Sequence, residues 1–376
     1  GANIFIYTGL IEKTKTPEEL IGVLAHEIGH IEGGHLIATR DAFERASYES
    51  IVGAVLGIGA AILTGQGEAA GAIIAGSQGI AGRRVLAHTR INESAADQAA
   101  LRYMDQAGIN PQGLVSFFRT LESQELLPSD QQSEYMRTHP LTRNRIDAIE
   151  NGGKASAAYG KPTPQKWQED HARMKAKLMG FINPVAVPWT YDDRDQSVPA
   201  LYARAIAAYR TDEVERSLKL MDQLLALEPS NPYFLELKGQ VLVDYGRIEE
   251  ALPIYRQSVS LLKKNSGLIR ISLAHALLES GKDERLNEVI ENLRAAMKDE
   301  SRSSTTHRLL ATAYGRQGHE VSAKLHLAEE AVLQRRFDYA RVQAEFVADN
   351  TTSGSRENLQ AQDILAYITH AKPKDK

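Results

Sequence analysis

The pentapeptide HEIGH at residues 26–30 decides how this chain is interpreted. Apolar residues at helical spacing surround it after a Thr-Pro start, and they predict one helix over residues 16–45. In such a helix His26 and His30 lie about one turn apart and face the same way, so one metal ion can bind both rings. Glu27 projects roughly 100° away from His26 around the helix, where it can take a proton from a metal-bound water.

A catalytic zinc site also needs a third protein ligand, and NESAAD at residues 92–97 offers carboxylates on a second predicted helix. Glu93 and Asp97 lie one turn apart and share a face. We expect Glu93 to complete the ligand set and Asp97 to accept a hydrogen bond from the ring of His26 or His30. The alternative is an acidic helix face that only contacts solvent.

Two further histidines follow the HEIGH motif at different distances. His139 precedes Pro140, which fixes the backbone, so a short turn can aim its ring at the metal or at the reacting oxyanion. A surface loop histidine is the alternative for this residue. His35 lies five positions after His30, about 140° around a continuous helix, and is predicted to lie outside the site.

The composition limits the partners and the ligands. The chain has 376 residues, enough for two or three domains, and its 44 Lys and Arg against 48 Asp and Glu give a net charge of -4. No overall positive field favours nucleic acid, and we expect no nucleic-acid partner. Without any cysteine, transition-metal ligands must be His, Asp or Glu.

Two apolar segments, residues 1–11 and 51–80, lie outside the three motifs. Residues 1–11 (GANIFIYTGLI) alternate like a β-strand and start abruptly, so we expect that upstream residues, a signal peptide among them, have been removed. Residues 51–80 are rich in Gly, Ala and Ile, but their uncharged run is shorter than the roughly 20 residues of a membrane span. We interpret them as a pair of short helices near the active site, with contact to a membrane or another protein as the alternative.

The second half of the chain is self-similar at a period of about 34 residues, the spacing of tetratricopeptide helix pairs. Ala205 and Ser217 are followed 34 positions later by Gly239 and Ala251, and four units are predicted. The expected organisation is a metallopeptidase domain at 1–150, a linker with one helix at 151–197, repeats at 198–345, and a C-terminal helix and tail at 346–376.

HEIGH, NESAAD and THPLTRNRI occur in this order, and with them residues 1–150 closely resemble the gluzincin family of the CAAX-prenyl, HtpX-like and BepA-like peptidases. The resemblance implies that His26, His30 and Glu93 hold Zn²⁺ and that His139 gates the metal or stabilises the transition state. It also implies that Asp97 is the Asp of the family's ExxAD-like segment. Arg143 and Arg145 are similar to basic residues that orient the site or the substrate.

The resemblance also implies an architecture and a biological setting. Lacking long transmembrane helices, the chain is similar to the soluble periplasmic branch, in which tetratricopeptide repeats follow the peptidase. The implied fold is mainly α, with a small sheet edge at residues 1–11 bordering the cleft. We expect a zinc endopeptidase for misfolded outer-membrane proteins, whose repeats contact the outer-membrane assembly machinery. The alternative is a chaperone-like scaffold with rare proteolysis.

Overall fold

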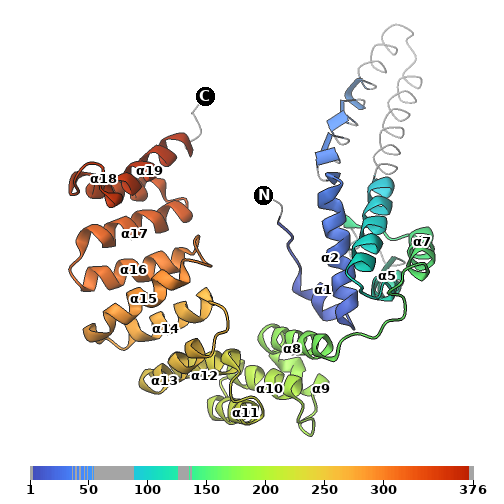
Figure 1. Cartoon of the computed structure of the whole chain (residues 1–376), viewed down its shortest axis with the longest axis horizontal. Coiled ribbons are helices and arrows are strands. Elements are labelled where there is room, and N and C mark those ends of the chain that lie inside the picture. Colours follow the sequence, from blue (N-terminus) through green and yellow to red (C-terminus); the bar gives the residue numbers. More distant parts are fainter. Residues whose placement is uncertain are drawn as a thin grey trace. The chain divides into compact units, whose positions relative to one another are not determined.

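The computed structural model describes residues 3–35, most residues from 37 to 54, residues 89–125, Tyr135 and residues 138–371. The chain forms two compact units, Gly1–Met179 and Gly180–Lys376, each described here by itself (Figure 1). Every regular element within the described residues is a helix. Nearly all of the 51–80 segment lies outside the described residues, and with it the predicted apolar helix pair.

The β-strand predicted for residues 1–11 is wrong. Thr8–Lys13 forms helix α1, and residues 3–7 belong to no sheet in the part of the chain that the structure describes. A strand needs a neighbouring strand to satisfy its backbone groups, and none of the described residues supplies one. Of this apolar segment, Leu10 is buried in the core of the first unit, whereas Phe5, Ile6 and Tyr7 are exposed.

Helix α2, Pro17–Glu32, carries the HEIGH motif. It begins as predicted, because the side chain of Thr16 caps it by accepting a hydrogen bond from the backbone of Glu19. It ends earlier than predicted, at Gly33 and Gly34, and the φ of +61° at Gly34 takes the backbone out of the helix. Helical backbone resumes at His35, so residues 16–45 are not one helix.

The core of the first unit lies between α2 and three later helices: residues 89–106 (the Glu93 helix), α5 (Gln112–Glu125) and α7 (Arg143–Lys154). Helix α2 packs on α5, and α5 packs on α7. The largest fully buried side chains of this core are Met104, Leu114, Phe117, Phe118, Leu121 and Ile149.

Helix α8, Gln165–Ile182, lies in the segment expected as a linker and is docked on the first unit through Thr14. The ring of His171 hydrogen-bonds to the Thr14 hydroxyl at 2.8 Å, and Lys175 Nζ donates to the Thr14 carbonyl at 2.6 Å. Its first turns therefore belong to the first unit.

The second unit opens with two short helices, η1 (Pro184–Ala186) and α9 (Val187–Thr190), and continues in helix pairs. The structure shows five pairs in its described part, one more than predicted. They are α10 (Val198–Arg210) with α11 (Val214–Leu227), α12 (Pro232–Asp244) with α13 (Ile248–Ser260), α14 (Gly267–Glu279) with α15 (Leu286–Ala296), α16 (Ser304–Arg316) with α17 (Glu320–Leu333), and α18 (Phe337–Asp349) with α19 (Arg356–Ala371).

The turns inside the five pairs share one backbone feature. Each contains one residue with positive φ, which lets the second helix fold back on the first. These residues are Asp212, Gly246, Gly281, Gly318 and Gly354.

The small residues that mark the repeat register lie at helix contacts. The Ser217 hydroxyl donates to the Ala205 carbonyl at 2.8 Å, and a Cβ added to Gly239 would lie 2.9 Å from the ring of Tyr255. The predicted fold class, mainly α with an α-solenoid in the second half of the chain, is confirmed in the described residues.

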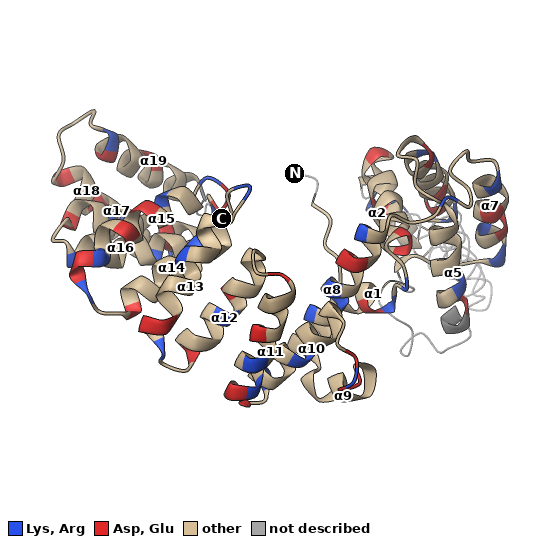
Figure 2. Cartoon of the chain, turned by 60° about the horizontal axis from the view of Figure 1, so that its bottom comes forward, with Lys and Arg blue, Asp and Glu red and all other residues tan. Residues whose placement is uncertain are grey.

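The surface of the helices is mixed in charge, with Lys and Arg interspersed among Asp and Glu over both units (Figure 2). Among the described residues, no helix has both the length and the apolar character needed to span a bilayer.

Candidate metal centre

Helix α2 places two imidazoles side by side in the interior of the first unit. His26 is fully buried and the His30 side chain is 17% exposed. Their Nε2 atoms lie 3.0 Å apart, as the one-turn spacing predicts. Glu27 lies next to them with its carboxylate half-buried.

The Glu93 helix supplies a carboxylate to the same point. Glu93 Oε2 lies 3.4 Å from His26 Nε2, and Glu93 Oε1 lies 3.4 Å from His30 Nε2. The two helices approach closely because Gly29, inside the HEIGH motif, has no side chain. A Cβ at that position would lie 2.9 Å from the Ala96 carbonyl oxygen and from the Ala99 side chain.

His139 also reaches this point, from the loop before α7. Its Nδ1 lies 3.4 Å from His26 Nε2 and 3.3 Å from the Glu93 carboxylate, and its Nε2 lies 3.5 Å from Glu27 Oε1. The ring stacks on Tyr135 with centroids 4.7 Å apart.

The donor atoms fit a zinc ion. His26, His30, Glu93 and His139 each offer one donor, and all four donors lie within 4.8 Å of one another. Zn–N and Zn–O bonds of about 2.0–2.1 Å in a tetrahedron separate neighbouring donors by roughly 3.3 Å. The separations of 3.0 to 3.4 Å among the His26, His30 and Glu93 donors, and from His139 to His26 and Glu93, match that value. Imidazoles and a carboxylate are ligands that zinc prefers.

A second ring of charges surrounds the donors. Asp97 Oδ1 lies 3.0 Å from His26 Nδ1, the ring nitrogen that points away from the other donors. The sequence predicts a hydrogen bond to Asp97 from either His26 or His30, and the structure places Asp97 at His26. Arg145 holds Asp97 with two bonds, Nε to Oδ2 at 2.7 Å and Nη2 to Oδ1 at 2.8 Å. Its Nη1 lies 3.0 Å from Glu93 Oε2 and donates to the Pro140 carbonyl at 2.7 Å.

These contacts shift the ionisation of the buried groups. Burial opposes charge on His26, but its bonds and charge interactions with Asp97 and Glu93 outweigh burial and raise the pKa to about 9. Burial also opposes charge on Glu93, yet bonds from His139, His26 and His30 hold the pKa of its carboxyl far below the usual range. The two groups therefore favour opposite charges, a positive charge on His26 and a negative charge on Glu93.

Arg143 is not brought to the site, although its sequence position suggested it. Its side chain is 79% exposed and pairs with Glu122 at 2.7 Å, whereas the Arg145 side chain is only 7% exposed. The reason is helical geometry, because residues two apart project roughly 200° from each other around a helix.

His35 contacts the metal-site residue His30, although the sequence predicts that His35 lies outside the site. The break at Gly33 and Gly34 turns the chain back, and His35 Nδ1 lies 3.0 Å from His30 Nδ1. If His30 gives its Nε2 lone pair to a metal, its Nδ1 carries the hydrogen and donates it to His35. A continuous helix would have pointed His35 elsewhere, so only the two adjacent glycines signalled this arrangement.

Replacing His35 by alanine is expected to weaken zinc affinity by about 10–100-fold, because the ring of His30 loses the partner that orients it. His35→Asn, whose amide oxygen can accept the same hydrogen bond, is expected to recover part of the loss. The measurement is competition with a fluorescent zinc chelator. Equal affinities for His35→Ala and the parent chain would show that this contact does not orient the ligand.

Tyr135 is the second missed residue. It is partly buried, its ring stacks on His139 and meets Phe117 edge-on at 5.8 Å, and the His139 amide donates to its carbonyl at 2.9 Å. Tyr135 also lines a small cavity of about 90 Å³ beside Glu27 and His139. The apolar residues that line this cavity are Phe5, Ile6, Tyr7, Leu10, Leu20, Val23 and Leu24.

Two histidines one turn apart on a buried helix, opposite a carboxylate from a second helix, define the metal centre of a metallopeptidase. Residues 1–152 match the sequence model of peptidase family M48.

Similarity to characterised proteins extends beyond this domain. The chain is 25% identical over 351 residues to the beta-barrel assembly-enhancing protease of Escherichia coli (strain K12), covering 90% of this chain and 69% of that protein. It is 30% identical over 147 residues to the metalloprotease YcaL of the same organism, covering 38% of this chain and 52% of that protein. The solved structure of MamA MSR-1 C2 superposes with a TM-score of 0.37 at 22% identity, covering 45% of this chain and 97% of that one.

Proposed function

We propose that this chain is a zinc-dependent endopeptidase whose repeats recruit polypeptides for the peptidase domain. The observation that carries the proposal is the convergence of four donor side chains from two helices and a loop, with Glu27 beside them. His26, His30 and Glu93 would hold the ion, which leaves one of the four donors, His139, free to exchange with substrate.

When bound, zinc would act as a Lewis acid that polarises a peptide carbonyl and lowers the pKa of water to near neutral. Glu27 takes the proton of the attacking water and then delivers it to the leaving amine. Its carboxylate suits this role because it lies at the donor cluster without being part of it. Asp97 and Arg145 hold the ring of His26 in place.

His139 has two roles open to it. Its position among the donors allows it to occupy the site before substrate arrives and so keep the enzyme inactive. Once displaced, it can donate a hydrogen bond to the oxyanion of the tetrahedral intermediate. Tyr135 would move with it, because the two rings stack.

The biological setting comes from the relatives. The similarity to a beta-barrel assembly-enhancing protease over 90% of this chain supports a periplasmic role in the quality control of outer-membrane proteins. In this role the substrates are misfolded or unassembled outer-membrane proteins, and the helix pairs of the second unit contact the assembly machinery. The proposed membrane contact through residues 51–80 lies outside the described residues.

The proposal is tested by metal content together with proteolysis of casein. We expect one zinc per chain, cleavage that a chelator stops, and recovery when zinc is added back. His139→Ala is expected to change the cleavage rate, upward if His139 blocks the site and downward if it stabilises the oxyanion. A chain that stays metal-free after zinc is supplied would contradict the proposal, and an unchanged rate for His139→Ala would exclude both of its roles.

A chaperone-like scaffold with rare proteolysis is the competing function, and the five helix pairs of the second unit favour it as a binding surface. Measurements on the same protein sample before and after chelation distinguish the two functions. A scaffold would bind unfolded chains equally well after chelation and would release no fragments in either case, whereas the endopeptidase would cleave casein only before chelation.

A further inference from the structure

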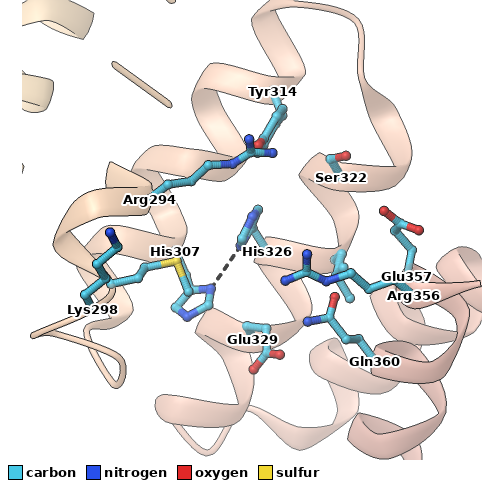
Figure 3. Close-up of a pocket in the computed structure, with 12 residues that line it drawn as sticks. Arg294, Lys298, His307, Tyr314, Ser322, His326, Glu329, Arg356, Glu357 and Gln360 are labelled. Carbon is cyan, nitrogen blue, oxygen red and sulfur yellow. Dashed lines mark hydrogen bonds between the residues drawn. The ribbon is translucent and has the colours of Figure 1, made fainter. Parts of the chain in front are cut away.

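The second unit contains a cavity of about 520 Å³ that the proposed peptidase chemistry does not use. Its wall comes mainly from the second helices of three successive pairs, α15, α17 and α19, with α16 contributing two residues (Figure 3). The residues that line this repeat cavity are Arg294, Met297, Lys298, His307, Tyr314, Ser322, Leu325, His326, Glu329, Arg356, Glu357 and Gln360.

Three cations stand around the repeat cavity without a carboxylate partner. Arg294 and Lys298 lie on one side and Arg356 on the other, with His326 between them (Figure 3). Within the described residues, none of these three cations forms an ion pair. Neighbouring arginines of the same unit are paired, for example Arg256 with Glu288 and Arg316 with Asp283. The positive charges at the cavity are therefore available to an anion.

The floor of the repeat cavity is a pair of neutral imidazoles. His307 Nδ1 lies 3.0 Å from His326 Nδ1, and the His326 ring stacks on Tyr314 with centroids 5.6 Å apart. Burial lowers the pKa of both histidines, and the nearby His307 and Arg294 help to bring that of His326 to about 4. Since the two Nδ1 atoms share one hydrogen, the acceptor ring must carry its own hydrogen on Nε2, where it can serve as a donor to a ligand.

We propose that the repeat cavity binds the carboxylate of an acidic polypeptide segment, held between Arg294 and Lys298 on one wall and Arg356 on the other. This inference rests on the proposed function, in which the repeats recruit polypeptides. It adds that the recruited segment carries an acidic side chain.

The lining favours a peptide over a phosphate. Two carboxylates, Glu329 and Glu357, also face the cavity, so its excess positive charge is small and suits one carboxylate better than a dianion. These acids and the Gln360 amide can accept hydrogen bonds from peptide N–H groups, which a phosphate lacks. Met297, Leu325 and Tyr314 supply apolar contact for neighbouring side chains, and the volume exceeds that of a single anion.

The test measures binding of a fluorescein-labelled peptide, Gly-Ala-Leu-Ala-Glu-Leu-Ala with an amidated end, by anisotropy. The Glu27→Gln chain is used, so that the peptide is not cleaved and a failure here leaves the peptidase proposal untouched. We expect the matching peptide with Gln in place of its Glu to bind at least tenfold more weakly. Arg294→Gln and Arg356→Gln are each expected to lower the affinity for the acidic peptide about tenfold or more, because each removes a charge-assisted hydrogen bond.

Arg308→Gln is the matched control, because Arg308 is an exposed arginine on α16 outside the cavity lining. It removes the same charge and should leave the affinity within about twofold. Thermal unfolding of Arg356→Gln and Arg308→Gln should match that of the parent chain, whereas Arg294→Gln should lower the midpoint slightly, because its guanidinium lies 5.8 Å from the centroid of the Tyr314 ring. Equal binding of both peptides, equal effects of Arg308→Gln and Arg356→Gln, or stronger competition by inorganic phosphate than by acetate would each overturn the proposal.

Discussion

Glu27→Gln is expected to lower the rate of proteolysis by about 10²–10⁴-fold while leaving zinc bound. The amide keeps the shape of the side chain but cannot take a proton from water. The metal should stay, because Glu27 is not among the four residues whose donor atoms converge. The measurement pairs casein cleavage with zinc content on the same sample.

Glu32→Gln is the matched control for this experiment. Glu32 lies on the same helix, its side chain is 57% exposed, and it pairs with Arg102 at the surface. Its substitution should leave cleavage within about twofold, since exposed ion pairs contribute little. Proteolysis that survives in Glu27→Gln at the rate of this control would refute the role of Glu27.

Arg145→Ala is expected to destabilise the zinc-free first unit by about 3–5 kcal/mol. Arg145 is buried and makes ionic contacts with both Asp97 and Glu93, so its removal takes one of two buried cations away from these carboxylates and leaves them with His26. Arg143→Ala, two positions earlier on α7, removes an exposed pair and should cost less than about 1 kcal/mol.

Urea unfolding measures this difference if the two units are followed separately. The chain has two tryptophans, Trp167 in the first unit and Trp189 in the second. Trp189 is 91% exposed, so a Trp189→Phe background leaves Trp167 fluorescence as a probe of the first unit at little cost. Similar midpoints for Arg145→Ala and Arg143→Ala would contradict the structural role of Arg145.

The convergence of the donor residues could be predicted because it follows from local spacing. Two histidines one turn apart must share a helix face, and the first residue of NESAAD to carry a carboxylate, Glu93, faces them. The position of Asp97 follows from the same spacing. The fixed backbone at Pro140 and the family resemblance both suggest that His139 approaches the site, but spacing alone does not place it, since its loop is set by tertiary contacts.

Two predictions were wrong because the spacing of apolar residues shows neither where a helix ends nor which elements lie beside it. The prediction for His35 failed because α2 ends at Gly33 instead of continuing. The strand at residues 1–11 failed because alternation fits a strand only where a partner strand is present. The fifth helix pair was missed because its sequence departs from the repeat, although its turn at Gly354 is equivalent to the others.

The guanidinium of Arg145 also determines how the loop that carries His139 can move. One nitrogen, Nη1, contacts both Glu93 and the Pro140 carbonyl, so the downstream side of that loop is fastened to the helix that supplies the third donor. If a substrate displaces the His139 imidazole as proposed, Arg145 would keep Pro140 next to Glu93. The imidazole could then return to the same position after the product leaves.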